Sequence, residues 1–161
     1  MAIRKFLEAE PRRHGNAGAE CQGLARAQRC QEAEQAVARI GHRGVHDALV
    51  AGQDRDFIGL LAWPNLHACR QLVGNPEATF EDVIRHPEVI ACLKRGLETH
   101  NASSTGSSMR IARAMLMAEP PSIDGNELTD KGYINQRAGL ERRAALVEKL
   151  YADKPGEDVI V

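Results

Sequence analysis

Aromatic residues are scarce in this sequence, because three Phe, two Tyr and one Trp make up only 4% of its 161 residues. A hydrophobic core must therefore be built mainly from Leu, Ile, Val and Ala, within the 43% of residues that are hydrophobic. No uninterrupted apolar run approaches the roughly 20 residues that cross a bilayer, so no membrane-spanning helix is expected. Residues 1–7 do not begin an apolar stretch of the kind found in secretory signals, and we expect a cytoplasmic protein.

Net charge is almost absent, since 21 basic and 22 acidic side chains leave a formal charge of −1. This balance gives no general attraction to nucleic acid or to an anionic membrane, and neither is expected as a partner. A nucleic-acid role for the arginines of residues 1–44 is the weakest of the functions considered, for the same reason.

The four cysteines are widely scattered and are predicted to be reduced thiols. They are Cys21, Cys30, Cys69 and Cys92. The first two precede His42 and His46, a combination that resembles a zinc motif. A zinc finger needs its two cysteines about two to four residues apart, whereas eight residues separate these two, so no metal site is predicted.

The chain divides at about residue 45 into segments of different character. Residues 1–44 are rich in Ala, Arg, Gln and Glu, and are predicted to be partly helical or disordered, with a weak helix over residues 23–40. Residues 45–152 form the ordered domain, and residues 153–161 are expected to be a flexible tail.

Within the domain, two short apolar runs separated by a polar turn predict an antiparallel hairpin over residues 47–63. Helices are expected over residues 66–73, from Thr79, from Pro87 to about residue 100, and over residues 135–152. Residues 109–118 favour a helix by propensity, but Met109, Ile111, Met115 and Met117 also fit an alternating pattern, and the segment is assigned as a strand. The prediction is an α+β fold with a small sheet of about three strands flanked by helices, preceded by a weakly helical or disordered N-terminal segment.

A loop rich in Pro, Gly and Asp, residues 119–134, carries Lys131. A loop lysine is usually only solvated, but a compact cation on a loop can also be brought to a place where negative charge develops. The Ser/Thr/Gly stretch 103–108 resembles a phosphate loop, but the required lysine is missing and a connection is favoured. We interpret the solvent-exposed face of a helix as carrying the nearby Arg137, Arg142 and Arg143.

Residues 128–137 read Leu-Thr-Asp-Lys-Gly-Tyr-Ile-Asn-Gln-Arg. This segment resembles the C-terminal loop of the feruloyl-CoA synthetases and related AMP-binding, acyl-adenylate-forming acyl-CoA synthetases, and the similarity extends over residues 45–152. The resemblance implies that Lys131 is a catalytic lysine for adenylation. The commoner family pattern, Thr-x-Ser-Gly-Lys-Ile, would put Tyr133 at the lysine position, so Tyr133 is a second candidate, as a phenol donor. Thr129, Asp130 and Gly132 would support the loop.

The same resemblance implies a larger catalytic assembly. In the family, ATP, Mg²⁺ and the acyl group bind a large adenylation domain, and the small domain rotates to help CoA react. The chain alone is therefore expected to bind no cofactor and to be inactive, with an adenylation domain as its partner. Either a truncated or frameshifted gene, with residues 1–44 from a wrong frame, or a standalone module beside a separate subunit would explain the sequence. The alternative function is a non-catalytic interaction module that docks through residues 109–137.

Overall fold

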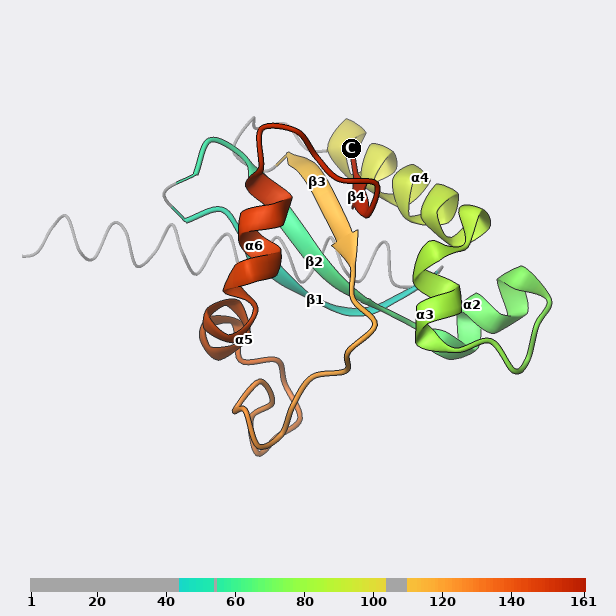
Figure 1. The fold of residues 1–161 in the computed structure, drawn as a ribbon, viewed down its shortest axis with the longest axis horizontal. Helices are drawn as coiled ribbons and strands as arrows, with labels where there is room; N and C mark the ends of the chain where they lie inside the picture. The colour runs from blue at the N-terminus through green and yellow to red at the C-terminus, as the bar shows by residue number, and fades with distance from the viewer. Residues whose placement is uncertain (1–43, 54, 104–109) are drawn as a thin grey trace, which may run out of the picture.

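A computed structural model describes residues 44–53, 55–103 and 110–161 (Figure 1). Within these ranges the elements are β1 (Val45–Ala51), β2 (Ile58–Pro64), α2 (Leu66–Val73), α3 (Phe80–Arg85), α4 (Pro87–Ser103), β3 (Ile111–Leu116), α5 (Gln136–Arg142), α6 (Ala144–Tyr151) and β4 (Val159–Ile160). The α+β class is confirmed. The helix predicted over residues 23–40, the Ser/Thr/Gly stretch from residue 104 onward, and Cys21, Cys30 and His42 lie outside the described residues.

The sheet has the order β1-β2-β3-β4. Strands β1 and β2 form the predicted antiparallel hairpin, with Leu49 opposite Leu61. Strand β3 then lies parallel to β2, and the connection between them passes through α2, α3 and α4. Strand β2 is consequently central, which explains why its sequence is a continuous apolar run rather than an alternating one.

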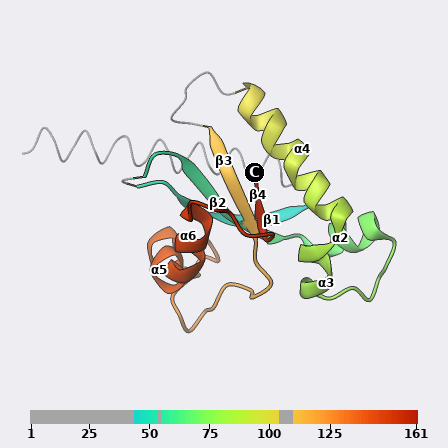
Figure 2. The same ribbon diagram turned by 45° about the horizontal axis from the view of Figure 1, so that its top comes forward.

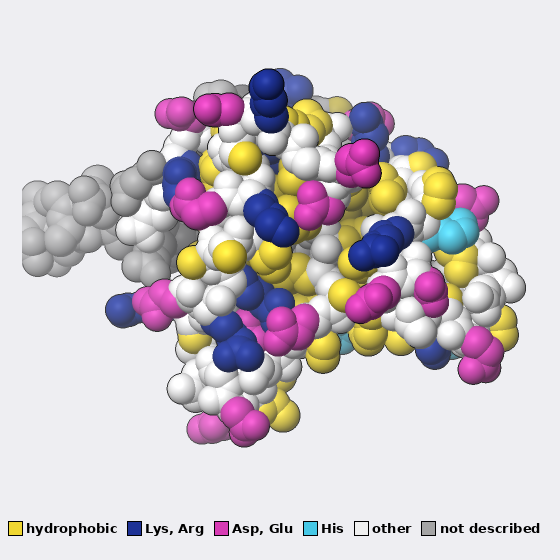
Figure 3. All heavy atoms as spheres, viewed as in Figure 1, with side chains coloured by type: hydrophobic (Ala, Val, Ile, Leu, Met, Phe, Trp, Pro, Cys, Tyr) yellow, Lys and Arg dark blue, Asp and Glu magenta, His cyan; other side chains and the backbone are white. Residues whose placement is uncertain are grey.

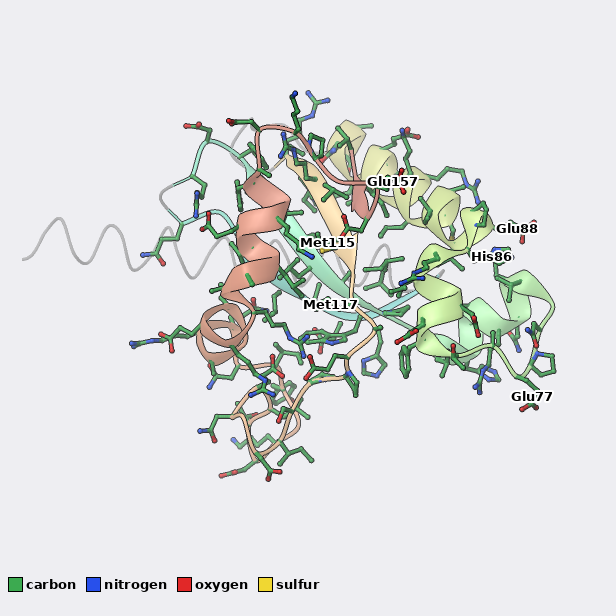
Figure 4. All side chains as sticks on the ribbon, viewed as in Figure 1. Glu77, His86, Glu88, Met115, Met117 and Glu157 are labelled. Carbon is green, nitrogen blue, oxygen red and sulfur yellow. The ribbon has the colours of Figure 1, made fainter. Side chains whose placement is uncertain are left out.

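Helices cover both faces of the sheet, and Figures 1 and 2 show α2–α4 on one side and α5–α6 on the other. Successive residues of a strand point to opposite faces. Leu60 and Ala62 therefore belong to the core that includes buried side chains of α3 and α4, whereas Leu61 and Trp63 belong to the core under α6. Met115 and Met117 also belong to this second core and lie near the centre of the molecule (Figure 4).

Short sequence motifs explain helices α3 and α4, which lie on the same face of the sheet as α2. Thr79 begins α3 with a capping box, in which the Thr79 N–H donates to Asp82 Oδ2 at 2.9 Å and the Asp82 N–H donates to Thr79 Oγ1 at 3.2 Å. Helix α4 buries Val89, Leu93 and Leu97 on the side that faces the sheet. It extends to Ser103, beyond the predicted end near residue 100.

Tyr151, at the end of α6, joins that helix to β2. Its hydroxyl donates to the Phe57 carbonyl at 2.8 Å and accepts from the Gly59 N–H at 3.1 Å. The two rings of Phe57 and Tyr151 stack with their centroids 4.7 Å apart. Arg113 reaches the same corner and donates to the carbonyl of Leu150 at 2.9 Å. Helix α6 is thus held at a fixed position on the sheet.

Two predictions about the C-terminal part were wrong. The sheet has four strands rather than about three, because β4 lies in the segment predicted to be a flexible tail. Val159 pairs with Met115 and Ile160 pairs with Ala114, and both side chains of β4 are more than nine-tenths buried. A strand of two residues is too short to produce an alternating pattern, so sequence periodicity could not reveal it.

The helix predicted over residues 135–152 is instead two helices that meet at Arg143, whose φ of −101° and ψ of 25° interrupt the α-helical geometry. Arg143 is also buried, which corrects its assignment to a solvated face. No helix in the described ranges is both long and apolar enough to cross a membrane.

Candidate functional site

The segment between β3 and α5 projects from the body of the domain on the side of α5 (Figures 1 and 2). Its outer end is a small hairpin in which Leu128 and Ile134 form a bridge. The Thr129 N–H donates to the Tyr133 carbonyl at 2.8 Å, and the Gly132 N–H donates to the Thr129 carbonyl at 2.8 Å. These two bonds close a three-residue tip, residues 130–132, and Lys131 is its middle residue.

Gly132 permits this tip. Its φ of +79° lies in the left-handed region, which residues with a Cβ avoid, and a three-residue hairpin loop requires that conformation at its third position. Thr129 adds a further bond, because its Oγ1 accepts from the Tyr133 N–H at 3.1 Å. Thr129 and Gly132 thus shape the tip, while the support roles of Thr129, Asp130 and Gly132 for the site and the catalytic roles of Lys131 and Tyr133 stay predictions.

The predicted site residues thus lie together on one exposed hairpin. Lys131 and Asp130 are exposed, and Tyr133 is 70% exposed. Lys131 forms no ion pair with any side chain in the described part of the chain. A lysine presented in this way can contact an anion on another surface without first giving up a partner.

The root of the hairpin is buried, in contrast to its tip. The side chain of Glu127, one residue before the bridge, has no exposed surface. Its Oε1 accepts from Arg143 Nε at 2.7 Å, and its Oε2 accepts from the Ser122 N–H at 2.7 Å and from Arg143 Nη2 at 3.1 Å. Arg142 Nε lies 3.7 Å from the same Oε2. Both carboxylate oxygens are therefore satisfied inside the protein.

Burial by itself would raise the pKa of Glu127. The hydrogen bonds from Arg143 and the Ser122 N–H, with the positive charges of Arg143 and Arg142, outweigh burial and hold that pKa below its ordinary value. Glu127 is consequently ionised at neutral pH, and the root of the hairpin contains a charged pair rather than a neutral hydrogen bond.

Arg143 extends this root to the sheet. Its Nη2 donates to the carbonyls of Glu119 at 3.3 Å and Pro120 at 3.1 Å, and its guanidinium lies 5.1 Å from the centre of the Trp63 ring. The Trp63 Nε1–H also donates to the Glu119 carbonyl, at 2.8 Å. The break between α5 and α6 therefore allows Arg143 to contact the loop backbone, the Glu127 carboxylate and strand β2 at the same time.

The other end of the hairpin is fixed by α5. The Asn135 N–H donates to the Glu127 carbonyl at 2.8 Å, and its side chain caps α5 by accepting from the Ala138 N–H at 3.4 Å. The Gln136 amide contacts the free edge of β1, accepting from the Val50 N–H at 3.0 Å and donating to the Ala48 carbonyl at 2.9 Å. Both ends of the hairpin are thus attached to the sheet.

The surface around the hairpin is uneven and partly apolar. Tyr133 and Ile123, the latter 75% exposed, are large hydrophobic side chains left in solvent on the same segment. Figure 3 shows acidic and basic side chains mixed over this region. Arg137 and Glu141 of α5 form an exposed ion pair. An open hollow of about 460 Å³ lies beside the tip. Its lining residues are Asn126, Leu128, Thr129, Asp130, Asn135, Arg137, Ala138 and Glu141.

Glu127 was not predicted to belong to the site, and Arg143 was assigned to a solvated helix face instead. A signal was present in the sequence, since Glu127 stands just before the hairpin, but nothing in the helical pattern separated Arg143 from its exposed neighbour Arg142. Within the described ranges, no three His, Cys, Asp or Glu side chains gather as a metal site would require.

The arrangement is that of a small domain that presents a lysine on an anchored loop. The family model of the AMP-binding enzyme C-terminal domain matches residues 29–155, which is most of the chain. The chain therefore belongs to the AMP-binding enzyme C-terminal domain family. No curated protein and no solved structure matches it.

Proposed function

We propose that this chain is the small domain of an ATP-dependent acid–CoA ligase of the feruloyl-CoA synthetase type, acting on aromatic carboxylic acids. The observation that carries the proposal is the exposed Lys131 at the middle of a three-residue tip whose root is buried. Family membership supports the adenylate-forming class, and the sequence of residues 128–137 supports the feruloyl-type branch.

The proposed reaction has two steps. A carboxylate oxygen of the acid attacks the α-phosphorus of ATP, the bond to the β-phosphate oxygen breaks, and pyrophosphate leaves to give the acyl-adenylate. The thiolate of CoA then attacks the acyl carbon and AMP leaves. Negative charge shifts onto the α-phosphate oxygens during the first step, and Lys131 would stabilise that charge.

ATP, Mg²⁺, CoA and the acid would bind mainly to an adenylation domain, in the same polypeptide or in a separate subunit. The exposed Tyr133 and Ile123 support docking, because they place apolar area on the segment that carries the cation, where a partner surface would cover it. Tyr133 would add a phenol O–H at the same contact. The 161-residue chain by itself is then inactive, since one cation cannot replace the nucleotide and acyl pockets.

Acid-dependent exchange of pyrophosphate into ATP tests this proposal. The purified chain, an adenylation domain of a feruloyl-CoA synthetase, and their mixture are compared with ferulate and with a short aliphatic acid. We expect exchange only in the mixture and only with the aromatic acid. Exchange by the chain alone would contradict the need for a partner surface, and a mixture no faster than the adenylation domain alone would contradict the proposed function.

A non-catalytic docking module is the alternative, and the same mixture distinguishes it. The module would bind the adenylation domain through the hairpin, so a Tyr133→Ser variant would weaken binding, but acyl-adenylate formation would not depend on Lys131.

A further inference from the structure

The buried pair Glu127–Arg143 connects three separate parts of the fold. The Glu127 carboxylate accepts hydrogen bonds from the Ser122 N–H, at the start of the loop, and from the Arg143 guanidinium, at the junction of α5 and α6. Arg143 in turn reaches the Glu119 carbonyl and Trp63 of β2. Any change at the pair must therefore alter how the loop is attached to the sheet.

Stability alone does not account for a charged pair at this place. Removing two charges from water costs several kcal/mol for each ion, and well-packed hydrophobic residues of similar size are often as stabilising. A charged pair does differ from an apolar contact in one respect, because its hydrogen bonds have defined directions and specify one arrangement of the groups.

Lys131 lies only four positions after Glu127, and the backbone hydrogen bonds of the hairpin between them are local. The Asn135 N–H donates to the Glu127 carbonyl, so both ends of the hairpin meet at Glu127. The orientation of the root consequently sets where the tip is presented.

We propose that Glu127 and Arg143 are positioning residues for Lys131, and that their pair holds the hairpin of residues 128–134 in the one orientation that delivers the lysine to an adenylation site. The catalytic role of Lys131 in this inference rests on the proposed function. The attachment of the hairpin can be tested without it.

Amide hydrogen exchange on the 161-residue chain provides the first test. In Glu127→Gln, the N–H groups of Thr129, Gly132 and Tyr133 should exchange about 10- to 100-fold faster, the range set by the loss of a hydrogen bond to a charged group. Those of Leu61 and Met115 in the sheet should be unchanged. The matched control is Glu141→Gln, which removes one exposed carboxylate from α5 and should leave the hairpin at its wild-type rate.

Two results would overturn the proposal. One is a hairpin that exchanges at the wild-type rate in Glu127→Gln. The other is an equal acceleration in the hairpin and the sheet, which would show that the pair stabilises the whole fold rather than the hairpin.

Arg143→Lys keeps the charge but loses the planar fork of the guanidinium, and provides a second variant in which amide exchange should accelerate in the hairpin alone.

A kinetic test links the pair to Lys131. With an adenylation domain present, Glu127→Gln should lower kcat for acyl-adenylate formation about tenfold or more and leave KM for ATP unchanged, while Glu127→Asp restores part of the rate. A raised KM with unchanged kcat would contradict a positioning role. If Lys131→Ala fails to slow the reaction, the proposed function fails, yet the exchange result still decides whether the pair fixes the hairpin.

Discussion

Gly139 determines how closely α5 approaches β1, and its replacement by alanine has a calculable effect. A Cβ at this position would lie 2.6 Å from Leu49 Cδ2 and 3.0 Å from Leu49 Cδ1, both below ordinary contact distance. Leu49 has no exposed surface and cannot move aside freely. We therefore predict that Gly139→Ala forces α5 away from the sheet.

Two opposing contributions set the magnitude of this change. Overpacking of a filled core costs about 1–3 kcal/mol. Alanine in place of glycine inside a helix recovers about 1 kcal/mol. The expected result for Gly139→Ala is a net loss of up to about 2 kcal/mol in the free energy of unfolding, measured by urea denaturation followed by circular dichroism at 222 nm.

The effect of Gly139→Ala on the free energy of unfolding should change from a loss to a gain when the Leu49 side chain is shortened. In a Leu49→Ala background the space beside Gly139 is open, so Gly139→Ala should stabilise the chain by about 1 kcal/mol through helix propensity. Ala138→Gly on the same helix controls for propensity alone. A Gly139→Ala variant that is more stable than the wild type, with Leu49 intact, would refute the packing argument.

The remaining predictions concern other contacts. Because the pKa of Glu127 is lower in the folded chain, its stabilisation is present above the ordinary glutamate pKa of about 4.3 and is lost as pH falls through the lower value. The fluorescence of Trp63, the single tryptophan, should report this acid transition, which Glu127→Gln should lack and Glu119→Gln should keep; an unchanged titration in Glu127→Gln would count against the pair. Tyr151→Phe should lower the free energy of unfolding by about 1–3 kcal/mol in urea denaturation, because the Phe57 carbonyl and the Gly59 N–H lose their partner. Ile160→Ala should cost about 2–5 kcal/mol in the same assay, whereas no measurable loss would restore the view of residues 153–161 as a flexible tail.

The parts of the fold that the sequence could predict are those with local causes. The β1–β2 hairpin follows from two apolar runs around a polar turn, and α3 begins where Thr79 and Asp82 can form a capping box. Strand β3 was assigned correctly despite helix-favouring residues, since Met115 and Leu116 are buried on opposite faces of the sheet. Neighbours in the sequence determine the hairpin and the start of α3, whereas the assignment of β3 also drew on the family resemblance.

The parts that could not be predicted depend on residues far apart in the chain. Strand β4 exists because Val159 and Ile160 find an open edge of β3, which no local pattern encodes. Arg143 looks like any exposed helical arginine until Glu127 and Trp63 are brought to it. The tip of the candidate site was located from the resemblance of residues 128–137 to a known family, whereas the pairing at its buried root could not be predicted.

We propose that the anchored hairpin delivers Lys131 to an adenylation site. The most direct measurement is the single-turnover rate constant for acyl-adenylate formation by the chain together with an adenylation domain, comparing Lys131→Ala with Lys94→Ala, which removes an exposed lysine from α4. Lys131→Ala should lower this rate constant on the order of 10²–10³-fold, the loss typical of removing one group that stabilises developing charge, and Lys94→Ala should leave it unchanged. Equal rates for the two variants would contradict the proposal.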